Sequence, residues 1–418
     1  MSFMDRLFTA TSATCVTGLT VMDVHTRLSL SGQICLLLLI QFGGLSLMAF
    51  SSVFILVLGK KISLRDKLTL KEVLNRYDMK NINHVVRYII FFTFIAELAG
   101  ALILYGKWTH IQGPLTRFYF AVFHSISAFC NAGFSLFQDN LNRFQNDAIT
   151  VFTITTLIIT GGLGFFVHFE LKDLFINRIK GFFRFITGQD RVIPMKLSLH
   201  SKMVLSTTLF LILTGIILLG LMEYNHLLAG KTFGNKFLIA YFQSVTPRTA
   251  GFNTIDISML TTSSLVIIIL FMFTGGSPGS TAGGIKTTSL ATIFFTIRSI
   301  LQGREKVTAF FKTIDDETVK KVLTIFILAF CLVLTATLLI LIREGSRFLF
   351  IQVLFEVVSA FGTVGLSTGI TSHLSDFSKL ILVLVMFTGR VGPLTFAISI
   401  IRKESTGISF PEENIGVG

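Results

Sequence analysis

A short motif that ends in glycine recurs four times along the 418-residue chain, and it constrains the fold more than any other feature. The copies end at Gly18, Gly133, Gly251 and Gly365, so successive glycines are 115, 118 and 114 residues apart. Self-similarity at a fixed period is typical of a chain built from repeated structural units. The spacing therefore predicts four equivalent modules, and four copies of one loop in one chain suggest a single ring.

The composition places these modules in a membrane. Hydrophobic residues make up 52% of the chain and charged residues only 14%, with a mean hydropathy of +0.74, which is too apolar for a soluble globular protein. The net charge of +13 could suggest nucleic acid, but the Lys and Arg residues lie in short loops between apolar spans. Such loops are typically cytoplasmic. We therefore expect an all-α polytopic membrane protein, no nucleic-acid partner, and the glycine motifs on the outer side.

Each module is predicted to consist of a helix, a short re-entrant helix, the glycine motif and a second helix. The second module shows the pattern most completely, with apolar helices at residues 86–105 and 149–169 and an amphipathic segment at 117–129. The corresponding segments of the other modules are 28–58 in the first, 203–224, 236–246 and 265 onward in the third, and 322–342, 348–361 and 380–401 in the fourth. The modules then occupy residues 1–75, 76–190, 191–310 and 311–418.

The glycine motifs are candidates for a selectivity filter. Irregular backbone at membrane depth is tolerated only where protein or a water-filled cavity surrounds it, and helices that end at the motif would point their negative dipole ends at the axis. Thr363-Val364-Gly365 also has the backbone chemistry with which potassium channels replace the water shell of an ion. Carbonyls of these residues are expected to bind a cation: Val16, Thr17, Gly18, Asn131, Ala132, Gly133, Thr249, Ala250, Gly251, Thr363, Val364 and Gly365.

The alternative for each motif glycine is that it only allows close helix packing, which four copies in register disfavour. Because one glycine recurs per copy, rather than the two of potassium channels, we expect a shorter and less strict filter.

Several ionisable residues lie near the motifs. Asp23 and Asp256 each follow their glycine by five residues and could concentrate cations at an outer vestibule, or they could be ordinary solvated loop acids. Glu97 and Glu356 lie in apolar stretches, and His124 lies in the predicted short helix of the second module. Buried ionisable groups in membranes are functional candidates. Hydrogen bonds that tie one module to its neighbour are the alternative that we favour for these three residues.

A second landmark follows each motif by 24 to 28 residues: Gly43-Gly44, Gly161-Gly162, Gly275-Gly276 and Gly389-Arg390. In the third module it opens a glycine-rich run, residues 275–288, that cannot stay helical. A phosphate loop is an alternative, but the spacing before Lys286 and the lack of a preceding strand speak against it. We predict a gate under the filter formed by Gly275, Gly276, Ser277, Gly279, Gly283, Gly284, Lys286 and Arg390, with Arg390 facing the pore.

These motifs resemble the Trk/Ktr/HKT superfamily of potassium transporters, and most closely its KtrB branch. The resemblance covers nearly the whole chain and is carried by residues 11–19, 130–134, 247–254, 275–288 and 389–395. It implies four pore modules around one pore, an intramembrane gating loop, a pore arginine, and a homodimer in the bacterial cytoplasmic membrane. It also implies regulation by a cytosolic ring of nucleotide-binding subunits of the KtrA or TrkA kind.

The transported ion is expected to be K⁺ bound at the filter, with no cofactor held by the chain, and uptake in this family is often linked to Na⁺. A sodium-permeable transporter is the alternative, although the family's usual clue for it, a serine in place of a filter glycine, does not occur here. A membrane enzyme acting on a phosphorylated substrate is a further alternative, but acids or histidines with catalytic spacing do not accompany the glycine-rich run. We therefore do not expect an enzyme.

The sequence departs from the family at its start, because members carry a membrane helix before the first filter and here the first module lacks it. We expect an apolar span of about 20 residues in the upstream reading frame. The tail at residues 411–418 resembles the end of KtrB chains, which takes part in the dimer contact.

Overall fold

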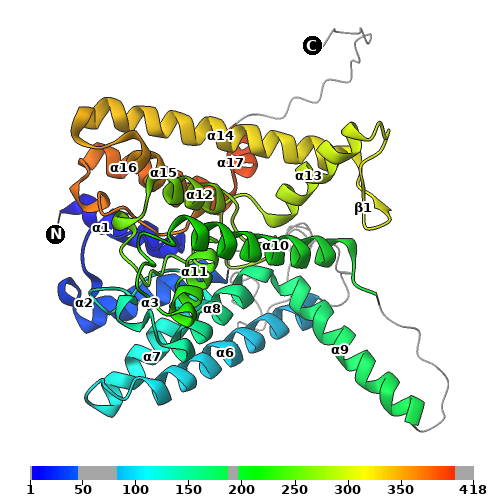
Figure 1. Cartoon of the computed structure of the whole chain (residues 1–418), viewed down its shortest axis with the longest axis horizontal. Helices are drawn as coiled ribbons and strands as arrows, with labels where there is room; N and C mark the ends of the chain where they lie inside the picture. Colours follow the sequence, from blue (N-terminus) through cyan, green and yellow to red (C-terminus); the bar gives the residue numbers. More distant parts are fainter. Residues whose placement is uncertain (1, 46–81, 187–195, 401–418) are drawn as a thin grey trace.

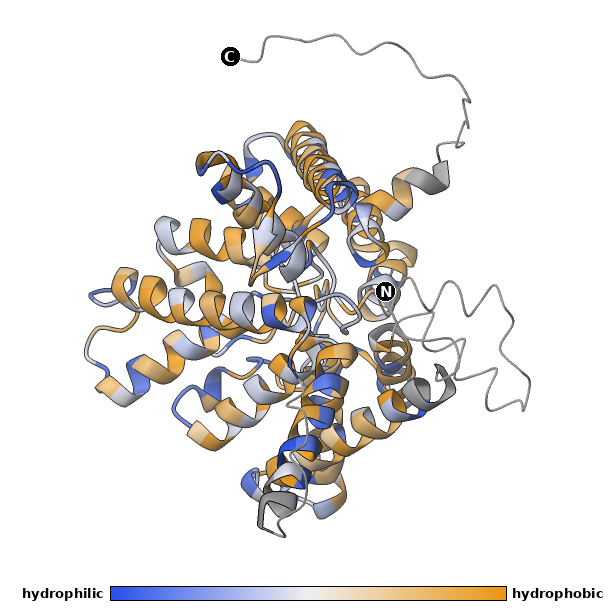
Figure 2. Cartoon of the chain, turned by 90° about the vertical axis from the view of Figure 1, so that its right-hand side faces the viewer, coloured by the Kyte–Doolittle hydropathy of each residue, from blue (hydrophilic) through white to orange (hydrophobic). Residues whose placement is uncertain are grey.

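The structure is a computed structural model, and it describes residues 2–45, 82–186 and 196–400. The described residues are mostly helical, as predicted, with very little strand. Figure 1 shows the helices α10 (Leu199–Met222) and α14 (Asp316–Glu344) running along the longest axis of the molecule, and Figure 2 looks along that axis and shows the helices arranged around a common centre. The all-α fold class is therefore confirmed.

The helices follow the predicted order within each module. The first module contains α1 (Phe3–Thr14), α2 (Val24–Arg27) and α3 (Leu30–Gly44), and the second contains α6 (Ile82–Lys107), α7 (Pro114–Phe129), α8 (Ala148–Leu163) and α9 (Phe165–Ile186). The third contains α10 (Leu199–Met222), α11 (Phe233–Val245), α12 (Thr262–Phe273) and α13 (Thr287–Leu301). The fourth contains α14 (Asp316–Glu344), α15 (Phe350–Gly362), α16 (Asp376–Val391) and α17 (Pro393–Ile400). We call α1, α7, α11 and α15 the pore helices.

Short polar side chains set where the helix after each motif begins. Ser29, Asp147, Thr261 and Ser375 are the N-cap residues of α3, α8, α12 and α16, and each side chain accepts a hydrogen bond from a backbone N–H of the first turn. Such caps satisfy N–H groups that the helix itself leaves unpaired. Each chain segment therefore leaves its motif, turns, and re-enters the molecule within 10 to 14 residues of the motif glycine.

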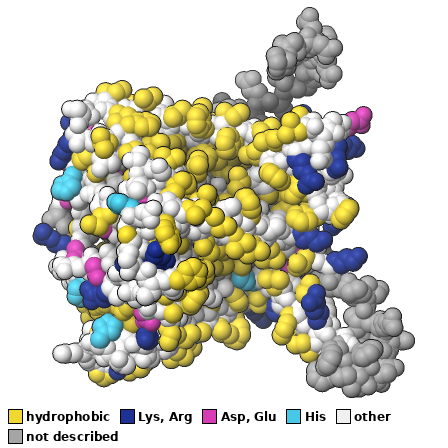
Figure 3. Space-filling view, viewed as in Figure 1, with side chains coloured by type: hydrophobic (Ala, Val, Ile, Leu, Met, Phe, Trp, Pro, Cys, Tyr) yellow, Lys and Arg dark blue, Asp and Glu magenta, His cyan; other side chains and the backbone are white. Residues whose placement is uncertain are grey.

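The outer faces of the helices are apolar. Among the described residues, α6, α10 and α14 are long and apolar enough to cross a membrane, and the α8–α9 pair would be a fourth span if it is counted as one. Large side chains such as Phe91, Phe210 and Phe330 are exposed on these outer faces. Figure 3 shows hydrophobic side chains over the middle of the molecule and most of the Lys and Arg side chains toward its ends. This distribution fits a multi-pass membrane protein.

Two of the predicted long helices are interrupted. The helix predicted over 149–169 ends at Leu163, and α9 continues at an angle of 99° to α8 (Figure 1). Gly164 at the bend has φ +89°, and a Cβ there would lie 2.7 Å from the Pro278 carbonyl oxygen, so only glycine fits. The helix predicted over 380–401 is likewise broken, at Gly392 with φ +99° before Pro393.

Other differences concern short elements and residues that are not described. A hairpin of two short strands, β1 (Thr308–Ala309) and β2 (Lys312–Thr313), was not predicted. The first-module helix predicted over 28–58 is described only as far as Gly44, as α3. The module boundary at residue 75 and the tail at 411–418 lie outside the described residues.

Candidate cation pathway

The four glycine motifs share one unusual backbone conformation. The residue two positions before each glycine has a positive φ, namely Val16 (56°), Asn131 (59°), Thr249 (69°) and Thr363 (50°). The glycines follow with φ values of 90°, 69°, 73° and 91°. Residues with a side chain rarely adopt positive φ. The same departure at the same place in all four copies shows that the motifs are structurally equivalent.

The four glycines are packed against one another in a closed ring. A Cβ at Gly18 would overlap the carbonyl oxygen of Ala132, and one at Gly133 would lie 2.7 Å from that of Ala250. A Cβ at Gly251 would overlap the carbonyl oxygen of Val364, and one at Gly365 that of Thr17. Each module therefore meets the next in the order first, second, third, fourth and back to the first. Glycine is required because the neighbouring backbone fills the space of a side chain.

Hydroxyl groups of the pore helices hold the backbone at the motif glycines. Ser12 and Ser359, each six residues before its glycine, accept a hydrogen bond from the N–H of Gly18 and Gly365, both at 3.1 Å. Ser127, at the same position in the second module, donates to the carbonyl oxygen of Phe134 at 2.8 Å. Thr246 makes the corresponding bond in the third module. These residues were not among our predictions, although serine recurs at that position in three motifs.

A cavity of about 560 Å³ lies on the outer side of the ring and is lined by all four motif glycines. Asp23 and Asp256 both line it, but each also caps a short helical turn, with His25 N–H donating to Asp23 at 2.8 Å and Ser258 N–H to Asp256 at 3.0 Å. Each acid therefore lines the cavity and also stabilises its own loop, so a role in attracting cations and a role as a loop acid do not exclude each other.

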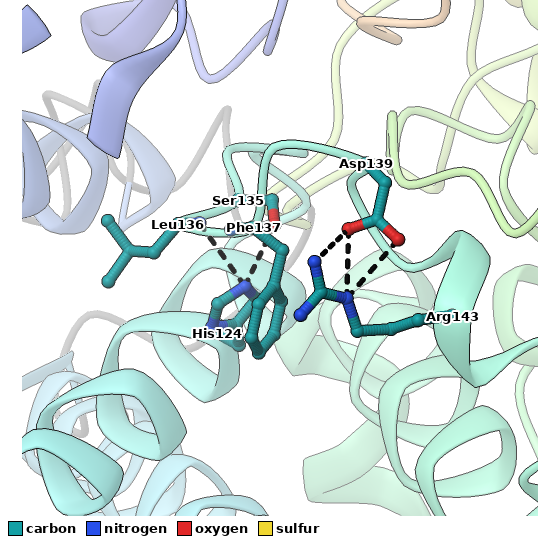
Figure 4. A network of polar contacts seen from close by, with 6 residues as sticks. All are labelled: His124, Ser135, Leu136, Phe137, Asp139 and Arg143. Carbon is teal, nitrogen blue, oxygen red and sulfur yellow. Dashed lines mark hydrogen bonds and ion pairs between the residues drawn. The ribbon is translucent and has the colours of Figure 1, made fainter. Parts of the chain in front are cut away.

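A third acid, Asp139, also lines this vestibule and was missed because it follows its glycine by six residues rather than five. Partial burial favours its protonated form, but the hydrogen bonds from Arg143, the shortest at 2.7 Å, hold the pKa of Asp139 below its usual value (Figure 4). Asp139 is therefore an anion at neutral pH.

The glycine-rich run of the third module lies directly beneath the ring, on the side away from the vestibule. A Cβ at Gly283 would overlap the Thr363 side chain, and Thr281 Oγ1 lies 3.0 Å from the Asn131 amide and 3.2 Å from the Phe129 carbonyl oxygen. The backbone is irregular over residues 274–286, which we call the sub-filter loop. The prediction was right for 275–286 and wrong for residues 287 and 288, which begin α13.

Backbone from two other modules anchors the sub-filter loop. Ser277 N–H donates to the Gly162 carbonyl oxygen at 2.9 Å, and Thr281 N–H donates to that of Gly161 at 3.2 Å. Gly284 N–H donates to the Gly389 carbonyl oxygen at 3.3 Å. The second glycine landmarks of the second and fourth modules therefore supply the carbonyl groups that hold this loop in place.

Arg390 connects the sub-filter loop to the first module. Its guanidinium donates to the carbonyl oxygens of Thr281 and Gly43, which belong to the third and first modules. It therefore contacts the loop directly rather than lying opposite it. Lys286 Nζ donates to the Ala282 carbonyl oxygen at 2.8 Å within the loop. Among the described residues, neither cation forms a salt bridge with a carboxylate.

Close packing explains why glycine occupies the first position of the second landmark in every module. A Cβ at Gly43, Gly161 or Gly389 would overlap the carbonyl oxygen of Thr14, Phe129 or Phe361, which in each module precedes the motif glycine by four residues. In the third module, a Cβ at Gly275 would instead overlap the carbonyl oxygen of Gly283 in the sub-filter loop. In the other modules, α3, α8 and α16 pack against the pore helix of their own module through this glycine. In the third module, the sub-filter loop takes the place of that contact.

The buried ionisable residues have different roles. Glu97 accepts a hydrogen bond from Gln41 Nε2 at 3.1 Å and so ties the second module to the first, as the favoured alternative predicted. Glu356 and His124 differ from that prediction, because each binds the chain that follows the glycine motif of its own module.

The fold resembles that of a solved membrane transporter. The crystal structure of the potassium transporter TrkH from Vibrio parahaemolyticus matches with a TM-score of 0.70, covering 96% of this chain and 79% of that chain at 19% sequence identity. The class of protein that the fold defines is therefore a helical, multi-pass membrane protein.

Sequence comparison identifies the family. The model of the TrkH family, described as cation transport protein, matches residues 1–409. The Ktr system potassium uptake protein B of Vibrio alginolyticus is 39% identical over 420 residues, which cover 100% of this chain and 89% of that protein. The protein of the same name from Bacillus subtilis is 37% identical, with 100% and 90% covered. The chain belongs to the TrkH family of cation transport proteins, and the predicted resemblance is confirmed.

The relatives are named as transporters rather than enzymes. A further relative, the potassium/sodium uptake protein NtpJ of Enterococcus hirae, is 36% identical and is covered to 90% of its length.

Proposed function

We propose that this chain takes up potassium ions through a filter made of the backbone of its four glycine motifs. The observation that carries the proposal is the closed ring of Gly18, Gly133, Gly251 and Gly365, in which the backbone of each module lies against that of the next. Carbonyl oxygens placed around one axis can replace the hydration shell of a cation. The names of the relatives, which are potassium uptake proteins, support potassium as the ion.

The sub-filter loop and Arg390 form the gate in this proposal. The loop lies beneath Thr363 and Asn131, and Arg390 fixes it to the backbone at Gly43, so a cation that leaves the filter meets backbone and a positive charge. Like charges repel strongly where water is scarce. Conduction therefore requires the loop and the guanidinium to move aside.

Two further parts of the proposal concern the assembly. We place the chain in the cytoplasmic membrane of a bacterium as a homodimer with one pore per subunit, regulated by a cytosolic ring of nucleotide-binding subunits of the KtrA or TrkA kind. The name "Ktr system", which two relatives carry, supports a multi-component transporter. Co-purification with such a subunit from membranes, with and without nucleotide, checks this part, and a chain that never binds the ring in either condition contradicts it.

Permeability to sodium is a second candidate function, because one relative is named a potassium/sodium uptake protein. The four filter glycines favour potassium, since a side chain at any of them would disturb the ring.

Potassium uptake by a bacterium that lacks its own potassium systems tests the pore assignment. The parent chain is compared with Gly365→Ser and with the control Gly230→Ser, a glycine with φ +72° and an open surrounding. We expect growth at low potassium with the parent and the control, and a fall of about tenfold in the discrimination against sodium with Gly365→Ser. Unchanged discrimination in Gly365→Ser would show that the ring is not the filter.

A further inference from the structure

One position of the pore helices, nine residues before the motif glycine, carries an ionisable side chain in two of the four modules. It is occupied by Glu356 in the fourth module and His124 in the second, and by Thr9 and Phe242 in the first and third. All four side chains are buried, with exposed fractions of 1%, 0%, 7% and 0%. A buried ionisable group is costly unless it is fully hydrogen-bonded, so Glu356 and His124 need partners.

Glu356 binds the loop that follows the filter in the fourth module. Its Oε1 accepts hydrogen bonds from Ser367 Oγ at 2.7 Å and from the Thr368 N–H at 2.9 Å. Its Oε2 accepts one from Thr371 Oγ1 at 2.6 Å. Hydrogen bonds to a carboxylate are stronger than those between neutral groups. The carboxylate therefore fastens the chain that leaves Gly365 to the pore helix behind it.

His124 makes the equivalent connection in the second module, as Figure 4 shows. The Leu136 N–H donates to His124 Nε2 at 3.3 Å, and Ser135 Oγ lies 3.0 Å from the same nitrogen. Because Nε2 accepts, Nδ1 carries the proton and donates to the Phe120 carbonyl oxygen at 2.8 Å. Ser135 and Leu136 follow Gly133 by two and three residues, as Ser367 and Thr368 follow Gly365.

Within the described parts of the first and third modules, this position makes no such connection. Thr9 Oγ1 donates to the Asp5 carbonyl oxygen at 2.8 Å within its own helix, and the Phe242 side chain has no hydrogen-bonding group. The outer loop of the third module is held instead by the second, through Leu141 N–H donating to the Asn253 carbonyl oxygen at 3.0 Å. Since the glycine ring runs in the order of the modules, the second and fourth lie diagonally across it.

We propose that Glu356 and His124 are specificity-determining positioning residues, which hold two diagonally opposed walls of the filter at a fixed separation. They do not touch the ion and act through the loops that leave Gly365 and Gly133. Discrimination between cations that differ little in size requires that the coordinating backbone be held in place. This inference rests on the proposed filter and adds the residues that keep it at its working width.

The ratio of potassium to sodium uptake by the full chain in membrane vesicles tests the proposal, with each rate divided by the amount of protein in the membrane. For Glu356→Ala we expect the ratio to fall about tenfold, because several hydrogen bonds to the loop are lost together. Glu356→Gln should stay close to the parent, since the amide can accept from Thr368 N–H and donate to Thr371 Oγ1. Thr371→Val, which removes one loop donor and leaves the helix intact, should lower the ratio about threefold.

The chain offers a matched control at the same position of another module. Thr9→Val removes a buried hydroxyl that bonds only within its own helix, so the ratio should not change. The proposal is overturned if Glu356→Ala and Thr371→Val reduce the amount or the rate but leave the ratio at the parent value. If the parent chain still takes up potassium in preference to sodium, the filter assignment stands and only this inference fails. If the parent chain takes up both ions equally, the filter assignment and this inference fail together.

Discussion

The four modules contribute alike to the glycine ring but differently to the layer directly beneath it. In the ring, every module contributes the same backbone conformation and each glycine meets the backbone of the next module. In the layer beneath, the modules do not all contribute the same groups. The third supplies the sub-filter loop, the fourth Arg390, and the first and second only carbonyl groups that bind them. In the function that we propose, four equivalent walls suit the recognition of a spherical ion, whereas a gate needs one part that can move relative to the others.

The largest expected effect comes from breaking the ring. Alanine at Gly18, Gly133, Gly251 or Gly365 places a Cβ against the backbone of the neighbouring module at a positive φ, which costs roughly 3 kcal/mol or more. We expect potassium uptake to fall by about a hundredfold in each variant, and by similar amounts in all four. Gly303→Ala is the control, because Gly303 has φ +63° and open surroundings. If one of the four alanine variants kept the uptake of the parent chain, the four modules would not be equivalent in the ring.

A smaller effect in the opposite direction is expected when the layer beneath is opened. Arg390→Ala removes the hydrogen bonds to the Thr281 and Gly43 carbonyl oxygens and a positive charge below the filter. We expect uptake to rise about tenfold with the ratio of potassium to sodium unchanged. Arg298→Ala, which removes an exposed arginine from the end of α13, serves as the control for charge alone. A loss of ion discrimination in Arg390→Ala would mean that the two layers are not separate in function.

The smallest effect is expected at the contact between the layers. Thr281→Val removes the hydroxyl that lies 3.0 Å from the Asn131 amide and 3.2 Å from the Phe129 carbonyl oxygen. Losing these hydrogen bonds should loosen the loop and raise uptake about threefold. Thr324→Val is the control, because Thr324 Oγ1 donates only to its own helix, at the Lys320 carbonyl oxygen. Slower uptake in Thr281→Val would indicate that the loop supports the filter rather than closing it.

The sequence predicts repeated parts of this molecule better than single ones. The motif glycines could be aligned across four copies, and the short segments predicted over 117–129, 236–246 and 348–361 are found as α7, α11 and α15. The bend at Gly164 could not be predicted, because it depends on the Pro278 carbonyl group of another module. Asp139 was missed because a single residue shifts it out of register with Asp23 and Asp256. The bonds of Glu356 and His124 depend on a loop whose path the sequence does not indicate.

The closed order of the glycine ring has a consequence for how such a pore can change. In a pore made of four identical chains, any substitution appears four times, and a replacement that suits one position must suit all of them. Here the ring is closed by one chain, so a codon change alters one quarter of the pore and leaves three unchanged. An arginine at residue 390, beside three modules that keep glycine at the matching place, is the kind of variation that only a single-chain ring permits.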